Sequence, residues 1–136
     1  MPRKLPLLTP ENAAFWQGGQ HGRLMVHHCR ACSRWFHPPA PVCPRCNALD
    51  VAPQAVSGRG TVATCTVNHQ AWTPELAAPF VVAIIELDDQ PGLRLLSNVV
   101  GIAPEQVRIG LPVQVRFEAQ EDVWLPLFEP VAGAVA

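Results

Sequence analysis

The chain lacks an excess of charge of either sign. Its 10 Lys and Arg residues face 11 Asp and Glu residues, which leaves a net charge of −1. Binding along a phosphate backbone needs clustered Lys and Arg, so this balance disfavours a general nucleic-acid coat protein, although it leaves room for a small basic patch. Only 15% of the residues are charged and 49% are hydrophobic. This composition is typical of a folded chain and not of an intrinsically disordered one.

Long hydrophobic runs are also missing. No stretch of 18 or more apolar residues is present, so no membrane-spanning helix is predicted. The opening residues 1–4 are not followed by the apolar run of a secretory signal, and we therefore expect a cytoplasmic protein. In that reducing compartment the five cysteines favour metal binding over disulfides. The 136 residues suffice for one modest core.

Fifteen prolines indicate many turns and few long helices. One short N-terminal helix is predicted within residues 9–21. Thr9 suits the N-cap, Pro10 fits the first helical position, and the pair Gly18-Gly19 is expected to end the helix. Phe15 and Trp16 are adjacent, so they cannot share one narrow face of it. Such a short helix is unstable alone and must pack on the rest of the protein.

The strongest motif is a pair of C-x-x-C sequences separated by ten residues, formed by Cys29, Cys32, Cys43 and Cys46. A two-residue spacer lets both sulfurs of a pair face one ion, and four thiolates suit tetrahedral zinc, or iron in the same site. Four unligated cysteines and two disulfides are the weaker alternatives. Because four sulfurs leave no open coordination position, the ion is expected to be structural. We assign this zinc ribbon to residues 22–56.

Residues 57–130 are predicted to be all-β. Alternation of apolar and polar residues, or β-branched runs, marks five strands near residues 61–68, 80–87, 93–100, 113–118 and 123–128. In the first of them Ala63, Cys65 and Val67 are expected to share the apolar face, which makes Cys65 an inert buried thiol. A single helical turn near residues 103–107 separates the third and fourth strands. Five strands with one such insertion favour an OB-fold barrel.

Catalytic patterns are missing from the local sequence, which shows no nucleophile–base pair and no paired carboxylates. Two weaker binding features remain. Arg59 lies in the turn Ser57-Gly58-Arg59-Gly60, which would let a phosphate approach the backbone but also fits a simple turn. Trp72 lies in a proline-containing loop, where an exposed aromatic side chain would serve binding and a buried one packing.

Taken together, the motifs resemble those of the zinc-ribbon/OB-fold proteins associated with acyl-CoA metabolism, formerly a domain of unknown function. The resemblance covers roughly residues 10–130. It rests on Phe15-Trp16 with nearby glycines, Gly22-Arg23-Leu24, the four ribbon cysteines with Pro38-Pro39-x-Pro41, Ser57-Gly58-Arg59-Gly60-Thr61-Val62, Pro79-Phe80-Val81-Val82-Ala83, Leu95-Leu96-Ser97-Asn98 and Val107-Arg108-Ile109-Gly110.

This resemblance implies a mainly β fold, with a helical lead-in, a rubredoxin-like zinc ribbon and a five-stranded OB barrel. It also implies a non-catalytic accessory subunit that bridges or completes a thiolase-fold enzyme (thiolase, aldolase or acyltransferase) or a hotdog-fold acyl-CoA hydratase, and that helps to hold acyl-CoA. Phe15, Trp16, Arg59 and Trp72 are the expected contacts with the partner or with acyl-CoA. The alternatives are a single-stranded nucleic-acid-binding ribbon and OB module, or an independent enzyme such as a thioesterase.

Overall fold

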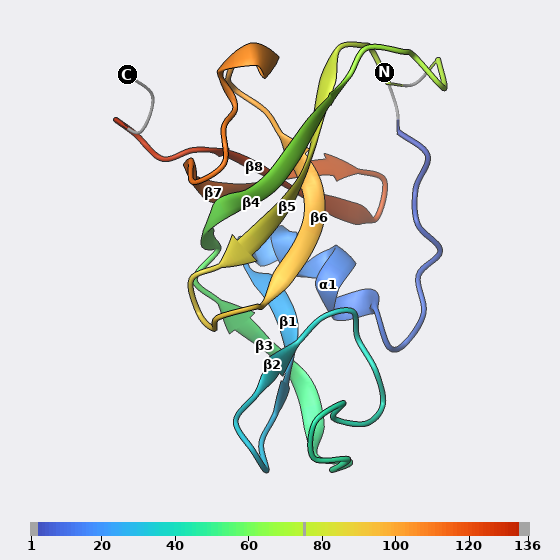
Figure 1. Ribbon diagram of the computed structural model, residues 1–136. Coiled ribbons are helices and arrows are strands. Elements are labelled where there is room, and N and C mark those ends of the chain that lie inside the picture. The colour runs from blue at the N-terminus through green and yellow to red at the C-terminus, as the bar shows by residue number, and fades with distance from the viewer. Residues whose placement is uncertain (1–2, 75, 134–136) are drawn as a thin grey trace.

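A computed structural model describes residues 3–74 and 76–133. Figure 1 shows a small sheet at one end of the molecule and a β-barrel at the other, with the α1 helix between them. The elements in chain order are α1 (Ala13–Gln17), η1 (Gly18–His21), β1 (Leu24–Cys29), β2 (Trp35–Phe36), β3 (Val51–Val56), β4 (Arg59–Asn68), β5 (Phe80–Leu87), β6 (Arg94–Val99), η2 (Pro104–Gln106), β7 (Pro112–Gln120) and β8 (Val123–Pro130). The fold is therefore mainly β, as the sequence predicted.

The N-terminal helix is shorter than expected. Thr9 and Asn12 cap each other, since each backbone N–H donates to the other's side-chain oxygen, at 2.8 and 3.2 Å. This reciprocal pairing holds residues 10–12 as a turn, so α1 begins only at Ala13. Nor does the helix end in a left-handed turn at Gly18. The chain continues as the 3-10 helix η1, and Gly22 takes the left-handed conformation, with φ of 70°.

Close packing explains why a glycine is needed at position 19, which was expected to end the helix. A Cβ atom on Gly19 would lie 2.5 Å from side-chain atoms of both Phe117 and Trp124. The absence of a side chain lets η1 lie directly on the β7–β8 hairpin. Gly19 therefore positions the helical lead-in against the barrel.

The ribbon sheet has the strand order β2-β1-β3, and both pairings are antiparallel. Its central strand β1 connects the lead-in to the first cysteine pair. The backbone N–H of Cys29 donates to Arg34 on the β2 side, whereas that of Arg30 donates to Asp50 on the β3 side. β3 forms an outer edge of this sheet and carries Pro53 opposite His27.

The barrel closes in the order β4-β5-β6-β8-β7, with β7 pairing back onto β4. Four of its five junctions are antiparallel ladders. The fifth is parallel and very short, because β6 and β8 meet only where Val99 faces Phe128. The backbone N–H of Val100 donates to Phe128 at the end of this junction, at 2.8 Å.

A β-bulge changes which residues of β4 face the core. Val62 lies opposite Ile85 and Thr64 opposite Ile84, so Ala63 is the extra residue. Val62 is consequently buried, and Ala63 is displaced from the apolar face on which the alternation had placed it. Beyond the bulge the alternation holds. Cys65 and Val67 pack against the core from half-buried positions.

One hydrophobic core joins the two units. Phe15 from α1 and Leu24 and Val26 from β1 belong to the same cluster as the inward-facing residues of the barrel. The ribbon tip contributes only a small second cluster of Cys29, Phe36 and Cys43. Within the described residues, no helix has the length and apolar character needed to cross a membrane.

Candidate functional site

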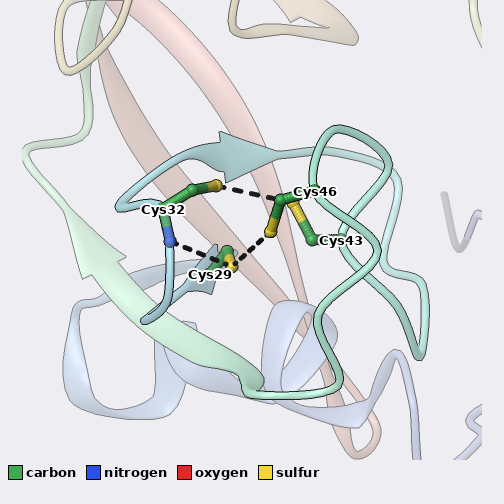
Figure 2. Close-up of side chains that lie close together, drawn as sticks. All are labelled: Cys29, Cys32, Cys43 and Cys46. Atoms are coloured by element: carbon green, nitrogen blue, oxygen red, sulfur yellow. Dashed lines mark hydrogen bonds between the residues drawn. The ribbon is translucent and has the colours of Figure 1, made fainter.

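The four ribbon cysteines converge on one point. Figure 2 shows the side chains of the two C-x-x-C turns facing each other across a small space. The Sγ atoms of Cys29 and Cys46 lie 3.6 Å apart, and those of Cys32 and Cys43 lie 3.7 Å apart. All four Sγ atoms are within 4.8 Å of one another. A tetrahedral zinc ion with bonds of about 2.3 Å places its sulfur ligands about 3.8 Å apart, so the donor set fits zinc.

Both turns are built in the same way. The residue immediately after each pair, Ser33 and Asn47, has a left-handed backbone with φ of 62°. This conformation turns the chain immediately after the second cysteine of each pair. Backbone N–H groups then point at sulfur: Cys32 donates to the Sγ of Cys29 at 3.5 Å, and Arg45 donates to the Sγ of Cys43 at 3.4 Å. Such contacts favour thiolates, the form that binds metal.

The pKa values of Cys43 and Cys46 are shifted in opposite directions. The backbone N–H of Cys46, with help from that of Arg45, lowers the pKa of Cys43 to about 6 against the opposing effect of burial. The pKa of Cys46 is raised to about 12, because burial and the neighbouring thiols outweigh the favourable backbone N–H of Ala48. Four thiolates so close together need a cation to neutralise them. The site is therefore chemically suited to a divalent ion.

Nearby arginines differ in their availability to offset the charge of a metal–thiolate centre. Arg30 forms an ion pair with Asp50 at 2.8 Å. Arg34 and Arg45, which line a shared hollow beside Pro44, form no ion pair within the described part of the chain. These two guanidinium groups are accordingly the better placed to balance the negative charge of a tetrathiolate site.

A second feature is an apolar groove of about 570 Å³ on the side of the barrel. Its walls come from the N-terminal segment, α1, the β4–β5 loop, β6 and β8. The residues that line it are Arg3, Lys4, Leu5, Pro6, Phe15, Trp16, Thr73, Leu76, Leu96, Ser97, Leu125, Pro126 and Leu127. The sequence did not predict this groove, because its walls come from segments far apart in the chain.

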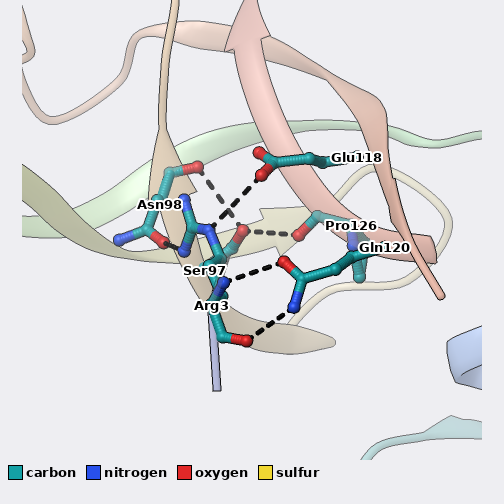
Figure 3. A network of polar contacts seen from close by, with 6 residues as sticks. All are labelled: Arg3, Ser97, Asn98, Glu118, Gln120 and Pro126. Atoms are coloured by element: carbon teal, nitrogen blue, oxygen red, sulfur yellow. Dashed lines mark hydrogen bonds and ion pairs between the residues drawn. The ribbon is translucent and has the colours of Figure 1, made fainter. Parts of the chain in front are cut away.

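One side of the groove is a segment of residues 3–8, which we call the strap. Figure 3 shows how Arg3 fastens it. The backbone N–H of Arg3 donates to the Gln120 side-chain oxygen at 2.8 Å, and the Gln120 amide donates to the carbonyl of Arg3 at 2.6 Å. The Arg3 guanidinium donates to Asn98 at 2.8 Å and lies 3.8 Å from a Glu118 oxygen. The strap is thus held at Arg3 and again at the Thr9–Asn12 turn.

The four residues expected to contact a partner or acyl-CoA do not lie together. Trp16 and Phe15 both line the groove, but Trp16 is half-buried, whereas Phe15 is only 7% exposed and packs mainly in the core. Trp72 is 70% exposed, and its indole N–H donates to Asn68 at 3.0 Å, which orients the ring. Arg59 is exposed at the start of β4 and is not among the residues lining the groove. Of the four, Trp72 and Arg59 are exposed, Trp16 is half-buried and Phe15 is buried, and their role as contacts stays a prediction.

The turn before β4 already holds an anionic group from the chain itself. The backbone N–H and hydroxyl of Ser57 both donate to the Asp89 carboxylate, the hydroxyl at 2.8 Å. The backbone N–H of Arg59 in turn donates to the Ser57 hydroxyl at 3.2 Å. These contacts favour the simple-turn interpretation over phosphate binding, because the donors that a phosphate would need are engaged.

A half-buried imidazole near α1 was also not anticipated. The ring of His37 lies 4.7 Å from that of Phe15, and its Nδ1 atom is buried without a hydrogen-bond partner in the described structure. Burial lowers the pKa of His37, and the positive charge of His27 lowers it further. His37 thereby acts as an apolar packing residue between the ribbon and α1.

Comparison with known proteins supports both units. Residues 16–52 match the family model described as the ChsH2 rubredoxin-like zinc ribbon domain, and residues 53–118 match the ChsH2 C-terminal OB-fold domain. The chain therefore contains a zinc ribbon whose four cysteines are positioned to bind a metal ion, followed by an OB-fold.

Individual relatives agree with these matches. The chain is 37% identical over 129 residues to a probable enoyl-CoA hydratase alpha subunit of Thermomonospora curvata, covering 94% of this chain and 40% of that protein. It is 33% identical over 101 residues to a DUF35 domain-containing scaffold protein of Methanothermobacter thermautotrophicus, covering 72% of this chain and 74% of that protein. The chain spans only about two-fifths of the length of the hydratase subunits that it matches.

A solved structure described as the Ltp2-ChsH2(DUF35) aldolase contains a chain with the same fold. The TM-score is 0.83 at 37% sequence identity, over 93% of this chain and 98% of that chain. From its two matched domains and these relatives, the protein belongs to the DUF35 family of zinc-ribbon/OB-fold proteins.

Proposed function

We propose that this protein is a non-catalytic accessory subunit of an acyl-CoA-transforming assembly. It would bridge or complete a thiolase-fold enzyme or a hotdog-fold acyl-CoA hydratase. The observation that carries the proposal is the near-complete match to a chain of the Ltp2-ChsH2(DUF35) aldolase. The similarity to an enoyl-CoA hydratase alpha subunit supports the same class of assembly, with a hydratase in place of the aldolase.

The zinc site contributes structure in this proposal. Cys29, Cys32, Cys43 and Cys46 are the proposed ligands, and together they occupy every position of a tetrahedral ion. A closed site offers no place for water or substrate on the metal. Its effect is to hold the ribbon tip, where only three residues form a buried cluster of their own. The ribbon is then a rigid extension of the barrel.

The proposal is tested by affinity purification of the tagged, zinc-loaded protein from its native lysate, followed by mass spectrometry after a moderate-salt wash. We expect near-stoichiometric recovery of a thiolase-fold enzyme or an acyl-CoA hydratase subunit. That subunit is then purified and recombined with the tagged protein. A stable complex whose acyl-CoA activity exceeds that of the enzyme subunit alone supports the proposal.

Two results would contradict it. Acyl-CoA turnover by the pure protein alone, lost on substitution of a single residue, would identify an independent enzyme. Recovery only of nucleic-acid-associated proteins, together with single-stranded DNA binding that weakens steeply with salt, would identify a nucleic-acid-binding module.

A further inference from the structure

The groove lies where two barrel strands separate. β6 and β8 pair only at Val99 and Phe128, and no ladder continues toward the start of β6. Two residues before Val99, the hydroxyl of Ser97 donates to the carbonyl of Pro126 at 2.7 Å. The Ser97 side chain thus connects β6 to β8 at a point where no backbone hydrogen bond joins the two strands. Beyond this contact the two strands form facing walls of the groove.

This separation leaves an edge of β6 without a partner strand. The peptide groups of a strand alternate in direction, and the N–H of Val100 points toward β8. The N–H and C=O of Leu96 therefore point to the same side, away from the ladder with β5. On that side β8 supplies no paired residue to Leu96. Leu96 lines the groove, and its side chain is 69% exposed.

Apolar side chains surround the free edge. Leu125 and Leu127 of β8 and Trp16 of α1 contribute apolar walls, and Leu5 of the strap lies among the lining residues. The described charged residues of the lining are Arg3 and Lys4, both cationic, while Glu75 of the adjoining loop lies outside the described residues. Arg3 is engaged by Asn98 and Glu118, whereas Lys4 is exposed and forms no ion pair within the described chain.

From this arrangement we propose that the groove is the docking site for an extended segment of the partner enzyme subunit, which pairs with the Leu96 edge of β6. The segment adds a short strand, places an apolar side chain between Trp16 and Leu127, and brings a carboxylate to Lys4. This inference rests on the proposed function, because it requires an enzyme subunit as partner. It specifies which surface of the chain holds that subunit.

Other occupants satisfy the groove less well. An acyl chain would fill the apolar volume, but it would bury the Leu96 N–H and C=O without hydrogen-bond partners, which is unfavourable. A second copy of this protein docked symmetrically would bring the Arg3 and Lys4 side chains of both copies to one interface, where like charges repel. An extended peptide with an acidic residue meets the apolar, main-chain and charge requirements together.

The test compares paired substitutions at one position. Leu96→Ser removes the side chain but keeps the N–H, whereas Leu96→Pro also removes the N–H that faces the groove. Ile109→Ser is the matched control, because Ile109 is equally exposed, at 69%, but does not line the groove. Zinc content and circular dichroism confirm that each variant is folded. Binding to the purified enzyme subunit recovered from the lysate is measured by biolayer interferometry.

We expect Leu96→Ser to weaken binding several-fold, Leu96→Pro to weaken it at least tenfold beyond Leu96→Ser, and Ile109→Ser to change it less than twofold. Lys4→Glu should slow association. If Leu96→Pro does not fold, hydrogen exchange of the wild-type protein supplies the second test. Its Leu96 amide should exchange much more slowly in the complex than in the free protein.

The outcomes separate this inference from the proposed function. If the enzyme subunit binds all variants equally and leaves the Leu96 amide unprotected, docking at this edge is wrong while the accessory role stands. If the enzyme subunit binds more tightly only when an acyl-CoA ligand is present, the groove holds that ligand and the inference is overturned. Self-association of the protein through Leu96 would overturn it as well. If no enzyme subunit binds the wild type, both proposals fail.

Discussion

The side chain of Gln90 forms two hydrogen bonds with the backbone of Trp35. The Trp35 N–H donates to the Gln90 carbonyl oxygen at 2.8 Å, and the Gln90 amide donates to the Trp35 carbonyl at 2.9 Å. Gln90 lies in the β5–β6 turn of the barrel, and Trp35 lies in β2 of the ribbon. The carboxamide thus substitutes for a neighbouring strand and joins the two units. Gln120 forms the same kind of reciprocal pair with Arg3.

Removal of the Gln90 amide should loosen the joint. We expect Gln90→Ala to lower the free energy of unfolding by about 1–2 kcal/mol, because two partly buried hydrogen bonds are lost. The measurement is urea unfolding of the zinc-loaded protein. Gln54→Ala, at an exposed position of β3, is the control and should change the stability by less than about 0.5 kcal/mol. Equal effects of the two substitutions would argue against a role for Gln90.

Loss of the other amide should release the strap. In Gln120→Ala the Arg3 backbone loses both of its hydrogen bonds to the barrel, so we expect faster trypsin cleavage after Lys4 under native conditions. Gln106→Ala, in the exposed helix η2, serves as the comparison. The rate of cleavage is followed by mass spectrometry. An unchanged rate in Gln120→Ala would mean that the strap is held mainly by its other contacts.

Loss of one ribbon cysteine should disorder the ribbon tip and leave the barrel folded. Cys46→Ala removes a proposed ligand, and the small cluster of Cys29, Phe36 and Cys43 cannot hold the tip alone. We expect substoichiometric zinc and collapsed NMR dispersion for residues 29–50, while barrel signals persist. Cys65→Ala should keep one zinc per chain. Stoichiometric zinc in Cys46→Ala would count against the ligand assignment.

Burial of His37 predicts a pH dependence of defined sign. Its pKa in the folded protein lies below the unfolded value of about 6.5, so the unfolded chain binds more protons between these two values. The contribution of His37 to stability is therefore complete above about pH 6.5 and is lost as the pH falls toward the folded pKa. An NMR titration of the His37 ring in the zinc-loaded protein measures this pKa directly. A midpoint at or above 6.5 would contradict the prediction.

Periodic patterns and the cysteine spacing predicted much of the architecture. The strand of residues 80–87 was predicted with its observed bounds, and the order of ribbon and barrel is confirmed. The predicted start of the short helix was wrong because Thr9 and Asn12 cap each other. The prediction that Ala63 lies on the apolar face was wrong because a bulge inserts one residue into β4. The alternation of apolar and polar residues does not reveal such a bulge. The exact domain boundaries stay a prediction.

The groove and the contacts that hold the strap could not be predicted from the sequence for a different reason. Arg3 meets Gln120 across 117 positions of the chain, and Trp35 meets Gln90 across 55. Such contacts depend on how the barrel closes, which no local pattern encodes. The sequence left open whether Trp16 and Trp72 are exposed or packed, and only the folded chain shows that Trp16 lines the groove and that Trp72 is exposed outside its lining.

The position of Pro53 in β3 disfavours pairing of this edge strand with a strand of another molecule. The N–H of Cys29 points toward β2, and because peptide groups alternate along a strand, the N–H of His27 points the same way. Pro53 faces His27 across the β1–β3 pair, so its backbone nitrogen is directed away from β1. Proline places no hydrogen at this nitrogen, and a strand arriving from solvent would find one of its acceptors unmatched. β3 is thereby protected against open-ended stacking of ribbons into fibres. The edge of β6 is restricted in another way, because the strap and the other lining side chains of the groove limit what can enter beside it.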